Sequence, residues 1–206
     1  MELTVLGATG RTGRLVVEQA LAQGHAVTAL VRDPAKLGAL AERVRVVTGD
    51  VRDAGALRAA VKGADGVISA LGPAGKDATL HRDVAPLLAQ AMRDAGTSRL
   101  VTISGAGADL PGDRKPFVDK VISKITHWAG AAQDKEAEHA VLAASGLDWT
   151  QVRPPRLVEG PASGSVKSDA HRPQGTKVTR ADLARFLVDE VAARRYVGQA
   201  PFVAAG

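Results

Sequence analysis

Three glycines at regular spacing follow the first apolar run of the chain and constrain its fold more than any other feature. Residues 7–16 read GATGRTGRLV after the strand-like run LTVLG, and apolar residues then recur at helical spacing up to Gly24. A strand, a glycine-rich turn and a helix in this order direct backbone N–H groups and a helix N-terminus at one point, which suits a pyrophosphate. The spacing is G-x-x-G-x-x-G, so its weight comes from this context.

The alternation of strand and helix continues along the chain. Further runs that predict buried strands lie at 25–32, 44–50, 64–72, 98–105 and 147–154, and the clearest helix between them lies at 80–95. The Val and Ile residues of these runs do not alternate with polar ones, which is typical of strands covered by helices on both sides. The sequence therefore predicts an α/β fold, a Rossmann-type doubly wound parallel sheet with helices on both faces.

Length and irregular stretches define the domain organisation. The 206 residues fit a single Rossmann-type domain spanning 1–206. The stretch 105–116 is dense in Gly and Pro, which predicts a long surface loop. The stretch 153–178 is also rich in Pro and Gly and shows little periodicity. We expect it to supply no further strand of the core and to cover the substrate as a small wall or lid.

Composition narrows the classes of partner. The net charge of +5 favours anionic ligands, but the basic residues are spread along the chain and aromatic residues are only 3%. We therefore expect a small-molecule acceptor, no nucleic acid, and a monomer or homodimer. Neither a membrane-spanning apolar run nor a basic leader before the first strand is present, which predicts a cytoplasmic protein without a membrane partner. Cysteine is absent and the five histidines lack ligand spacing, so no metal site is expected.

Each glycine of the first turn has a distinct expected task. Gly7 would form the tight turn, Gly10 would let a diphosphate approach the backbone, and Gly13 would let the helix pack closely on the strand.

The end of the second strand bears on the choice between NADP and NAD. Arg32 stands at the strand end, Lys36 lies one helical turn later, and Arg11 projects from the glycine turn towards the same volume. Three cations can neutralise a ribose 2′-phosphate, which favours NADPH over NAD. Asp33 is the opposing observation, since it is either the carboxylate that binds the ribose of NAD or a cap for a helix starting at Pro34.

Several motifs together resemble a known family. They are TVLGATGRTGRLVVEQALAQGHAVTALVRDP, VTGDVRD, ISALG, VTISGAG, KEAEHAVLAASGLDWTQVRPPRL and the late VTRADLARFLVDEV. Over nearly the whole chain they resemble the atypical short-chain dehydrogenase/reductases, in particular the NAD(P)H-binding NmrA-like group that includes the biliverdin-IXβ/flavin reductases. The resemblance implies fold and cofactor but not substrate, because that group holds reductases, epimerase-like enzymes and cofactor-sensing regulators.

The resemblance also implies cofactor contacts by position. It places Gly7, Thr9, Gly10, Arg11 and Thr12 on the phosphates, Arg32 and Lys36 on the 2′-phosphate, Asp50 and Val51 beside the adenine, Ala70, Leu71 and Gly72 along the cofactor after the fourth strand, and Ser104 near the nicotinamide.

The usual proton donor of short-chain dehydrogenases is missing. Those enzymes use a Tyr whose pKa is lowered by a Lys four residues later. The only tyrosine here, Tyr196, is followed four positions later by Ala200. We therefore expect an NADPH-dependent reductase whose flavin, quinone or similar conjugated acceptor takes hydride and then a proton from water. The alternative is a non-catalytic NADP(H)-binding redox sensor, and sugar-nucleotide epimerisation ranks below both because it needs the tyrosine.

Three residues are candidates for assisting the reaction: Ser104, His127 and Lys135. Ser104 follows a strand at the edge where ligands bind in open sheets, and its alternative role is to cap that strand. His127 is either a proton donor or an ordinary residue of an amphipathic helix. Lys135 is expected near the start of a helix, as an assisting group or as a surface lysine. The buried side of that helix would carry Ala137, Ala140, Val141 and Ala144.

The segment after the sixth predicted strand completes the candidate set. Residues 153–157 read RPPRL, where Arg153 and Pro154 are expected beside the cofactor. The prolines would stiffen a wall, and Arg153 or Arg156 would meet an acidic substrate or the cofactor phosphates.

Overall fold

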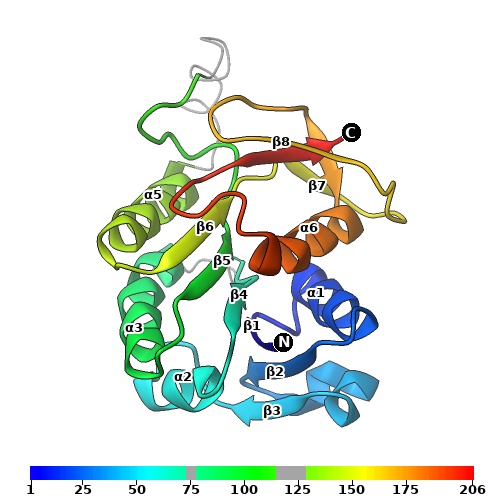
Figure 1. Cartoon of the computed structure of the whole chain (residues 1–206), viewed down its shortest axis with the longest axis vertical. Coiled ribbons are helices and arrows are strands. Elements are labelled where there is room, and N and C mark those ends of the chain that lie inside the picture. Colours follow the sequence, from blue (N-terminus) through cyan, green and yellow to red (C-terminus); the bar gives the residue numbers. More distant parts are fainter. Residues whose placement is uncertain (73–77, 115–128) are drawn as a thin grey trace.

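The computed structural model describes residues 1–72, 78–114 and 129–206. In chain order the elements are β1 (Glu2–Leu6), α1 (Arg11–Ala22), β2 (Ala26–Val31), the 3-10 helix η1 (Pro34–Glu42), β3 (Arg45–Thr48), α2 (Ala54–Val61), β4 (Gly66–Ser69), α3 (Leu80–Asp94), β5 (Arg99–Ile103), α5 (Ala129–Ala144), β6 (Asp148–Val152), β7 (Arg156–Val158), β8 (Val166–Asp169), β9 (Lys177–Thr179), α6 (Arg180–Ala193) and β10 (Phe202–Ala205). Figure 1 shows their arrangement.

A six-stranded parallel sheet forms the centre of the molecule, with the strand order β3-β2-β1-β4-β5-β6. The order reverses between β1 and β4, which creates the crevice where doubly wound folds bind their ligands. Helices α1 and α6 pack together on one face, and α2, α3 and α5 cover the other (Figure 1). The predicted doubly wound α/β fold is therefore confirmed.

The core strands carry apolar side chains on both faces of the sheet. In β1 the side chains of Leu3 and Val5 join the core under α1 and α6, whereas Leu6 joins the core under α2 and α3. All five residues of β5 are buried. Such two-sided burial explains why the sequence shows continuous Val and Ile runs instead of alternation.

The segment 153–178 adds no strand to the main sheet, as expected, but it is more regular than its composition suggests. It contains β7, β8 and most of β9. Strand β7 pairs in parallel with β9, and β8 pairs antiparallel with β10. Figure 1 shows β7 and β8 together at the end of the molecule opposite β3. Strands of three and four residues in a segment rich in Pro and Gly, without a longer apolar run around them, leave too little pattern for detection from the sequence.

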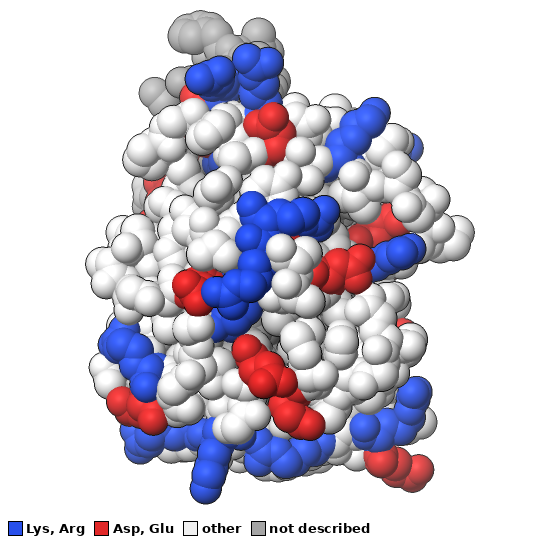
Figure 2. Space-filling model, in the orientation of Figure 1, with Lys and Arg blue, Asp and Glu red and all other residues white. Residues whose placement is uncertain are grey.

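The surface carries charges of both signs. Figure 2 shows lysine and arginine side chains scattered over one face, with carboxylates among them. Among the described residues, Met1 is the one large hydrophobic side chain that is exposed. Within the same residues, no helix combines the length and apolarity that crossing a membrane requires.

Candidate functional site

The predicted site residues that the structure describes lie at one edge of the main sheet. The glycine turn follows β1, Arg32 follows β2, Asp50 follows β3, Ala70 follows β4 and Ser104 follows β5. Because the strands are parallel, their carboxyl ends meet along this edge. His127 is outside the described residues.

The glycine turn is packed too tightly for side chains at two of its glycines. Gly7 has a φ of +78°, and a Cβ there would stand 2.7 Å from the carbonyl oxygen of Ala70. A Cβ on Gly13 would stand 2.0 Å from the carbonyl oxygen of Gly7. The first contact joins the turns after β1 and β4, and the second lets α1 approach β1. Both agree with the tasks expected of these glycines.

The start of α1 offers hydrogen-bond donors to a ligand. Gly10 is the N-cap residue, and no side chain caps this helix. The backbone N–H groups of Arg11, Thr12 and Gly13 have no acceptor within the described part of the chain. The first turn of α1 also lacks an acidic residue. Unsatisfied N–H groups at the positive end of a helix fit a phosphate or diphosphate, so the residues present suit a dinucleotide here.

In the loop after β2, Asp33 has one of the two roles expected from the sequence, that of a helix cap. Its side chain accepts a hydrogen bond of 3.1 Å from the backbone of Ala35, so Asp33 caps η1. The side chains of Arg32 and Lys36 are exposed, and neither forms a hydrogen bond or ion pair with the described residues. Arg14, which the sequence reading did not single out, fixes this loop by donating to the carbonyl oxygens of Lys36 and Leu37 at 2.5 and 2.9 Å.

The side chain of Arg11 contacts a carboxylate of this chain. Its guanidinium lies 3.5 Å from the carboxylate of Glu159, one residue beyond β7. The same carboxylate oxygen accepts from Arg180 at 2.9 Å. The Arg11 side chain is thus directed at the segment after β7 in this structure, and the convergence of three cations on a 2′-phosphate stays a prediction.

The turns after β3 and β4 lie at the same edge of the sheet as the glycine turn. Asp50 accepts a hydrogen bond of 2.8 Å from the backbone of Arg52, which fixes the turn that carries the half-buried Val51. Ala70 donates its N–H to the carbonyl oxygen of Leu6 at 2.9 Å. Leu71 is half-buried and Gly72 exposed.

Ser104 and Lys135 are brought together at the end of β5. The Oγ atom of Ser104 is buried and forms no hydrogen bond within the described part of the chain. The Nζ atom of Lys135 donates to the carbonyl oxygen of Ile103, the residue before Ser104, and contacts His81 Nδ1 at 2.8 Å and Glu138 Oε2 at 3.2 Å. Burial lowers the pKa of Lys135 below its ordinary value, although Glu138 opposes this shift. The ammonium is thus used in fixing β5.

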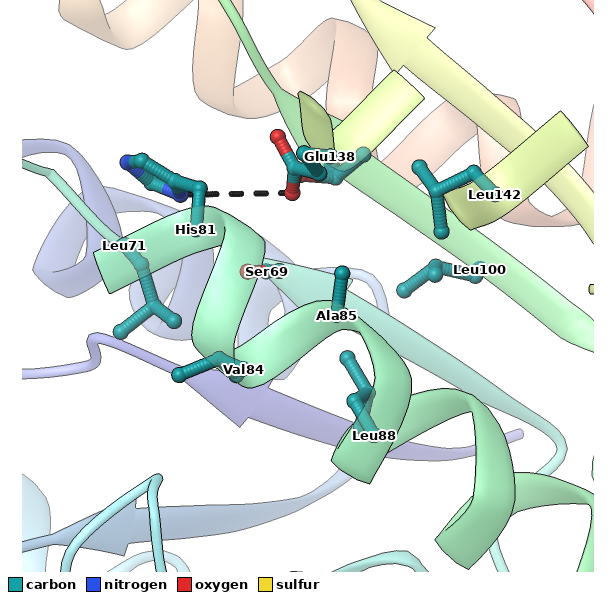
Figure 3. Close-up of a pocket in the computed structure, with 10 residues that line it drawn as sticks. Ser69, Leu71, His81, Val84, Ala85, Leu88, Leu100, Glu138 and Leu142 are labelled. Atoms are coloured by element: carbon teal, nitrogen blue, oxygen red, sulfur yellow. Dashed lines mark hydrogen bonds and ion pairs between the residues drawn. The ribbon is translucent and has the colours of Figure 1, made fainter. Parts of the chain in front are cut away.

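Glu138 is the centre of a buried polar cluster that the sequence reading missed. Its Oε1 accepts from Thr102 at 2.9 Å and lies 4.0 Å from His81 Nδ1, and its Oε2 accepts from Gln151 at 3.1 Å. Figure 3 shows His81 and Glu138 facing each other above a small pocket. The residues that line this pocket are Ser69, Leu71, His81, Val84, Ala85, Leu88, Leu100, Thr102, Glu138 and Leu142. The sequence signal for this cluster was that Lys135 and Glu138 lie three positions apart, which places them on the same face of a helix.

The buried face of α5 is not the one that the sequence predicted. It begins at Ala129, so Lys135 does not lie at its start. The buried residues are Asp134, Glu138 and Leu142, whereas Ala140 and Ala144 are exposed. Asp134 accepts from the backbone N–H groups of residues 81 and 82 at 3.0 and 2.9 Å, and thereby caps α3. The prediction failed because it assigned the apolar residues to the interior, whereas here carboxylates with partners are buried.

Arg153 is part of the internal framework and is not directed at a ligand. It is 1% exposed, its two terminal nitrogens each donate to Asp113 at 2.7 Å, and its guanidinium lies 3.8 Å from the ring centroid of Phe202. The expected contact of Arg153 with substrate or phosphate is therefore corrected, because its charge is already neutralised inside the protein. Pro154 is buried and accepts from the backbone of Ala106 at 2.9 Å.

Comparison with known proteins indicates an NAD(P)H-binding family. The profile of a family described as NAD(P)H-binding matches residues 7–194. The Bacillus subtilis (strain 168) protein YwnB is 32% identical over 200 residues, which cover 93% of this chain and 92% of YwnB. The solved structure of ChuY, an anaerobillin reductase from Escherichia coli O157:H7, is 25% identical with a TM-score of 0.82, and the match covers 100% of this chain and 97% of ChuY.

A second solved structure supports the fold alone. It is a Streptococcus pneumoniae TIGR4 protein named as a candidate NADH-flavin reductase, and it is 24% identical with a TM-score of 0.82 over 100% of both chains.

Proposed function

Since this chain belongs to the NAD(P)H-binding, NmrA-like group of atypical short-chain dehydrogenase/reductases, we propose that it is an NADPH-dependent reductase of a flavin, quinone or similar conjugated acceptor. The observation that carries the proposal is the buried Oγ of Ser104, which has no partner within the described residues and stands at the edge that also holds the glycine turn. A buried hydroxyl without a partner costs stability, so a ligand that bonds to it would remove this cost.

The chain's own residues divide the work in this proposal. The free N–H groups at the start of α1 bind the diphosphate, and Arg32 and Lys36 bind the 2′-phosphate. NADPH supplies hydride to the acceptor when both are bound. Ser104 orients the reacting groups, and Lys135 holds the end of β5 in place through Ile103.

The missing tyrosine supports an acceptor that takes its proton from water. The hydroxyl of Tyr196 lies 2.9 Å from Ser168 Oγ in β8, so it is used within the small sheets. Lys135 donates to Ile103 and Glu138 and contacts His81 Nδ1, so its ammonium is held by groups of the protein. A conjugated acceptor needs mainly orientation from the protein, which this site can provide.

The missing tyrosine also favours a second function, a redox sensor that binds NADP(H) without turnover. Steady-state oxidation of NADPH with FMN, riboflavin and a panel of quinones distinguishes the two. Turnover above the rate without protein, reduced in the Ser104→Ala variant, supports the reductase. Tight NADPH binding without turnover of any acceptor overturns the reductase in favour of the sensor.

A further inference from the structure

Glu159 places a negative charge next to the glycine turn, where an anionic ligand is expected. Its Oε1 is the shared acceptor of Arg180 at 2.9 Å and Arg11 at 3.5 Å. Arg11 is the first residue of α1, and its own backbone N–H is one of the free donors. The carboxylate of Glu159 therefore contacts the side chain of Arg11, whose backbone N–H faces the position expected for the diphosphate.

The two arginines that share this carboxylate differ in mobility. The side chain of Arg180 is 10% exposed and begins α6, so its position is fixed by packing. The side chain of Arg11 is 77% exposed, and its contact with Glu159 is the longer of the two. Glu159 itself is 66% exposed, but its contact with the more buried and less mobile Arg180 is the shorter of the two. Arg11 is thus the partner that can leave.

We propose that Glu159, anchored by Arg180, competes with the cofactor phosphates for Arg11 and thereby sets the affinity for the cofactor and its rate of release. The proposal rests on the function proposed above, because it assumes that a dinucleotide binds at the glycine turn. When the anion arrives, the Arg11 side chain moves from Glu159 to a phosphate oxygen, while Glu159 remains on Arg180. Each binding event therefore gives up one ion pair, and each release restores it.

The substitution Glu159→Gln tests this directly. It removes the competing charge and preserves the shape of an exposed side chain, so NADPH should bind about three- to tenfold more tightly at low ionic strength and dissociate more slowly. The gain should shrink as the salt concentration rises, because the side chains of Arg11 and Glu159 are 77% and 66% exposed and salt weakens interactions between exposed charges. Glu2→Gln is the matched control, since Glu2 is an exposed glutamate at the opposite end of β1.

A double-mutant cycle identifies the residue through which Glu159 acts. In an Arg11→Gln background, Glu159→Gln should no longer change the NADPH dissociation constant. A gain that persists without Arg11, or a gain no larger than that of Glu2→Gln, overturns the proposal.

Inorganic pyrophosphate is the second probe, and it separates this inference from the reductase activity. Glu159→Gln should tighten pyrophosphate binding in the same Arg11-dependent way. That result supports the competition even where no acceptor is reduced. Wild-type protein that binds neither NADPH nor pyrophosphate overturns both the competition and the proposed function.

Discussion

At the scale of single residues, the hydroxyls of Thr102 and Ser104, both at the carboxyl end of β5, differ in their hydrogen bonding. The Thr102 hydroxyl donates to Glu138 at 2.9 Å, whereas the Ser104 hydroxyl is buried without a partner in the described residues. A hydroxyl that costs stability and yet stands at the ligand edge is typical of a residue kept for function.

This contrast gives opposite expectations for removing the two hydroxyls. Ser104→Ala should leave the free energy of unfolding unchanged or raise it by up to about 1 kcal/mol, while turnover falls about tenfold to a hundredfold. Thr102→Val should lower the free energy of unfolding by about 1 to 2 kcal/mol because Glu138 loses a donor. Urea denaturation and steady-state kinetics measure both. Equal destabilisation by the two substitutions would contradict the site role of Ser104.

Arg32 offers a test of the cofactor preference at the same scale. If its exposed guanidinium binds the 2′-phosphate, Arg32→Ala should weaken NADPH by about 1 to 3 kcal/mol and leave NADH almost unchanged. Arg58→Ala, at an exposed position of α2, is the control. Titration by nucleotide fluorescence measures the dissociation constants, and an equal loss for both nucleotides would return NAD to first place.

Residue roles that depend on distant partners could not be predicted. The sequence correctly indicated the glycine turn, because the positive φ of Gly7 and the close packing of Gly13 on Gly7 arise within one strand-turn-helix unit. It misassigned Arg153, whose partner Asp113 lies 40 positions away, and it missed His81, which meets Lys135 across 54 positions. No local pattern announces such pairs, because they form only when the sheet brings separate segments together.

At the scale of elements, prediction succeeded where a pattern was long and local. Five of the six core strands carry an uninterrupted buried run, such as the five residues of β5, whereas the edge strand β3 is only half-buried at Val46 and Val47. The strands β7, β8 and β9 escaped because their stability depends on pairing with each other and with β10. The side chain of Asp182, near the start of α6, helps to hold the region of β7, β8 and β9 against the core.

Asp182 clamps the chain before β8 to the start of α6. It accepts from the backbone of Ser163 and Gly164, both at 3.1 Å, and from the hydroxyls of Ser163 and Thr179 at 2.9 and 2.8 Å. Burial acts to raise its pKa, but these hydrogen bonds outweigh it, so the pKa lies below the ordinary value. The stability that Asp182 contributes is thus complete above the ordinary pKa and is lost as pH falls through the lowered one.

Asp182→Asn should therefore lower the free energy of unfolding by about 1 to 3 kcal/mol at pH 7. The difference from wild type should shrink once the pH falls below about 4. Hydrogen exchange should also accelerate in residues 163–169, next to the clamp. Asp94→Asn, at an exposed position of α3, is the control. A difference that stays constant with pH in urea denaturation would contradict the clamp.

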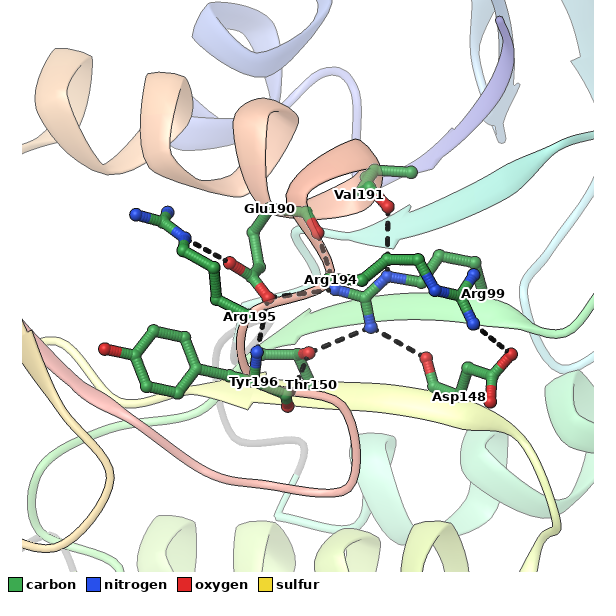
Figure 4. A network of polar contacts seen from close by, with 8 residues as sticks. All are labelled: Arg99, Asp148, Thr150, Glu190, Val191, Arg194, Arg195 and Tyr196. Atoms are coloured by element: carbon green, nitrogen blue, oxygen red, sulfur yellow. Dashed lines mark hydrogen bonds and ion pairs between the residues drawn. The ribbon is translucent and has the colours of Figure 1, made fainter.

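At the scale of the whole molecule, α6 joins parts of the chain that are far apart in sequence. It packs on α1, its start holds the small-sheet region through Asp182, and its end holds the amino edge of the main sheet through Glu190. Figure 4 shows this last network, in which Arg99 lies between Glu190 and the backbone of Asp148. The network lies at the edge of the sheet opposite the glycine turn, so it serves the fold and not the chemistry.

Glu190 is the residue on which this network depends. It is fully buried, and its carboxylate accepts from Arg99 at 3.2 Å, from Arg195 at 3.1 Å and from the backbone of Tyr196 at 2.9 Å. Glu190→Gln preserves the volume but leaves the buried guanidinium of Arg99 without a counter-charge, which should cost about 3 to 5 kcal/mol of unfolding free energy.

The neighbouring substitution Asp189→Asn is the matched control, because Asp189 is half-exposed and its surface ion pair with Arg185 should be worth less than about 1 kcal/mol. Urea denaturation at pH 7 measures both variants. For Glu190→Gln the midpoint should fall at an unchanged m-value, because the residue joins parts of one cooperative domain. The affinity for NADPH in the folded protein should remain that of wild type, since the glycine turn lies at the other edge. A loss no larger than that of Asp189→Asn would contradict the role of Glu190 in joining α6 to the sheet.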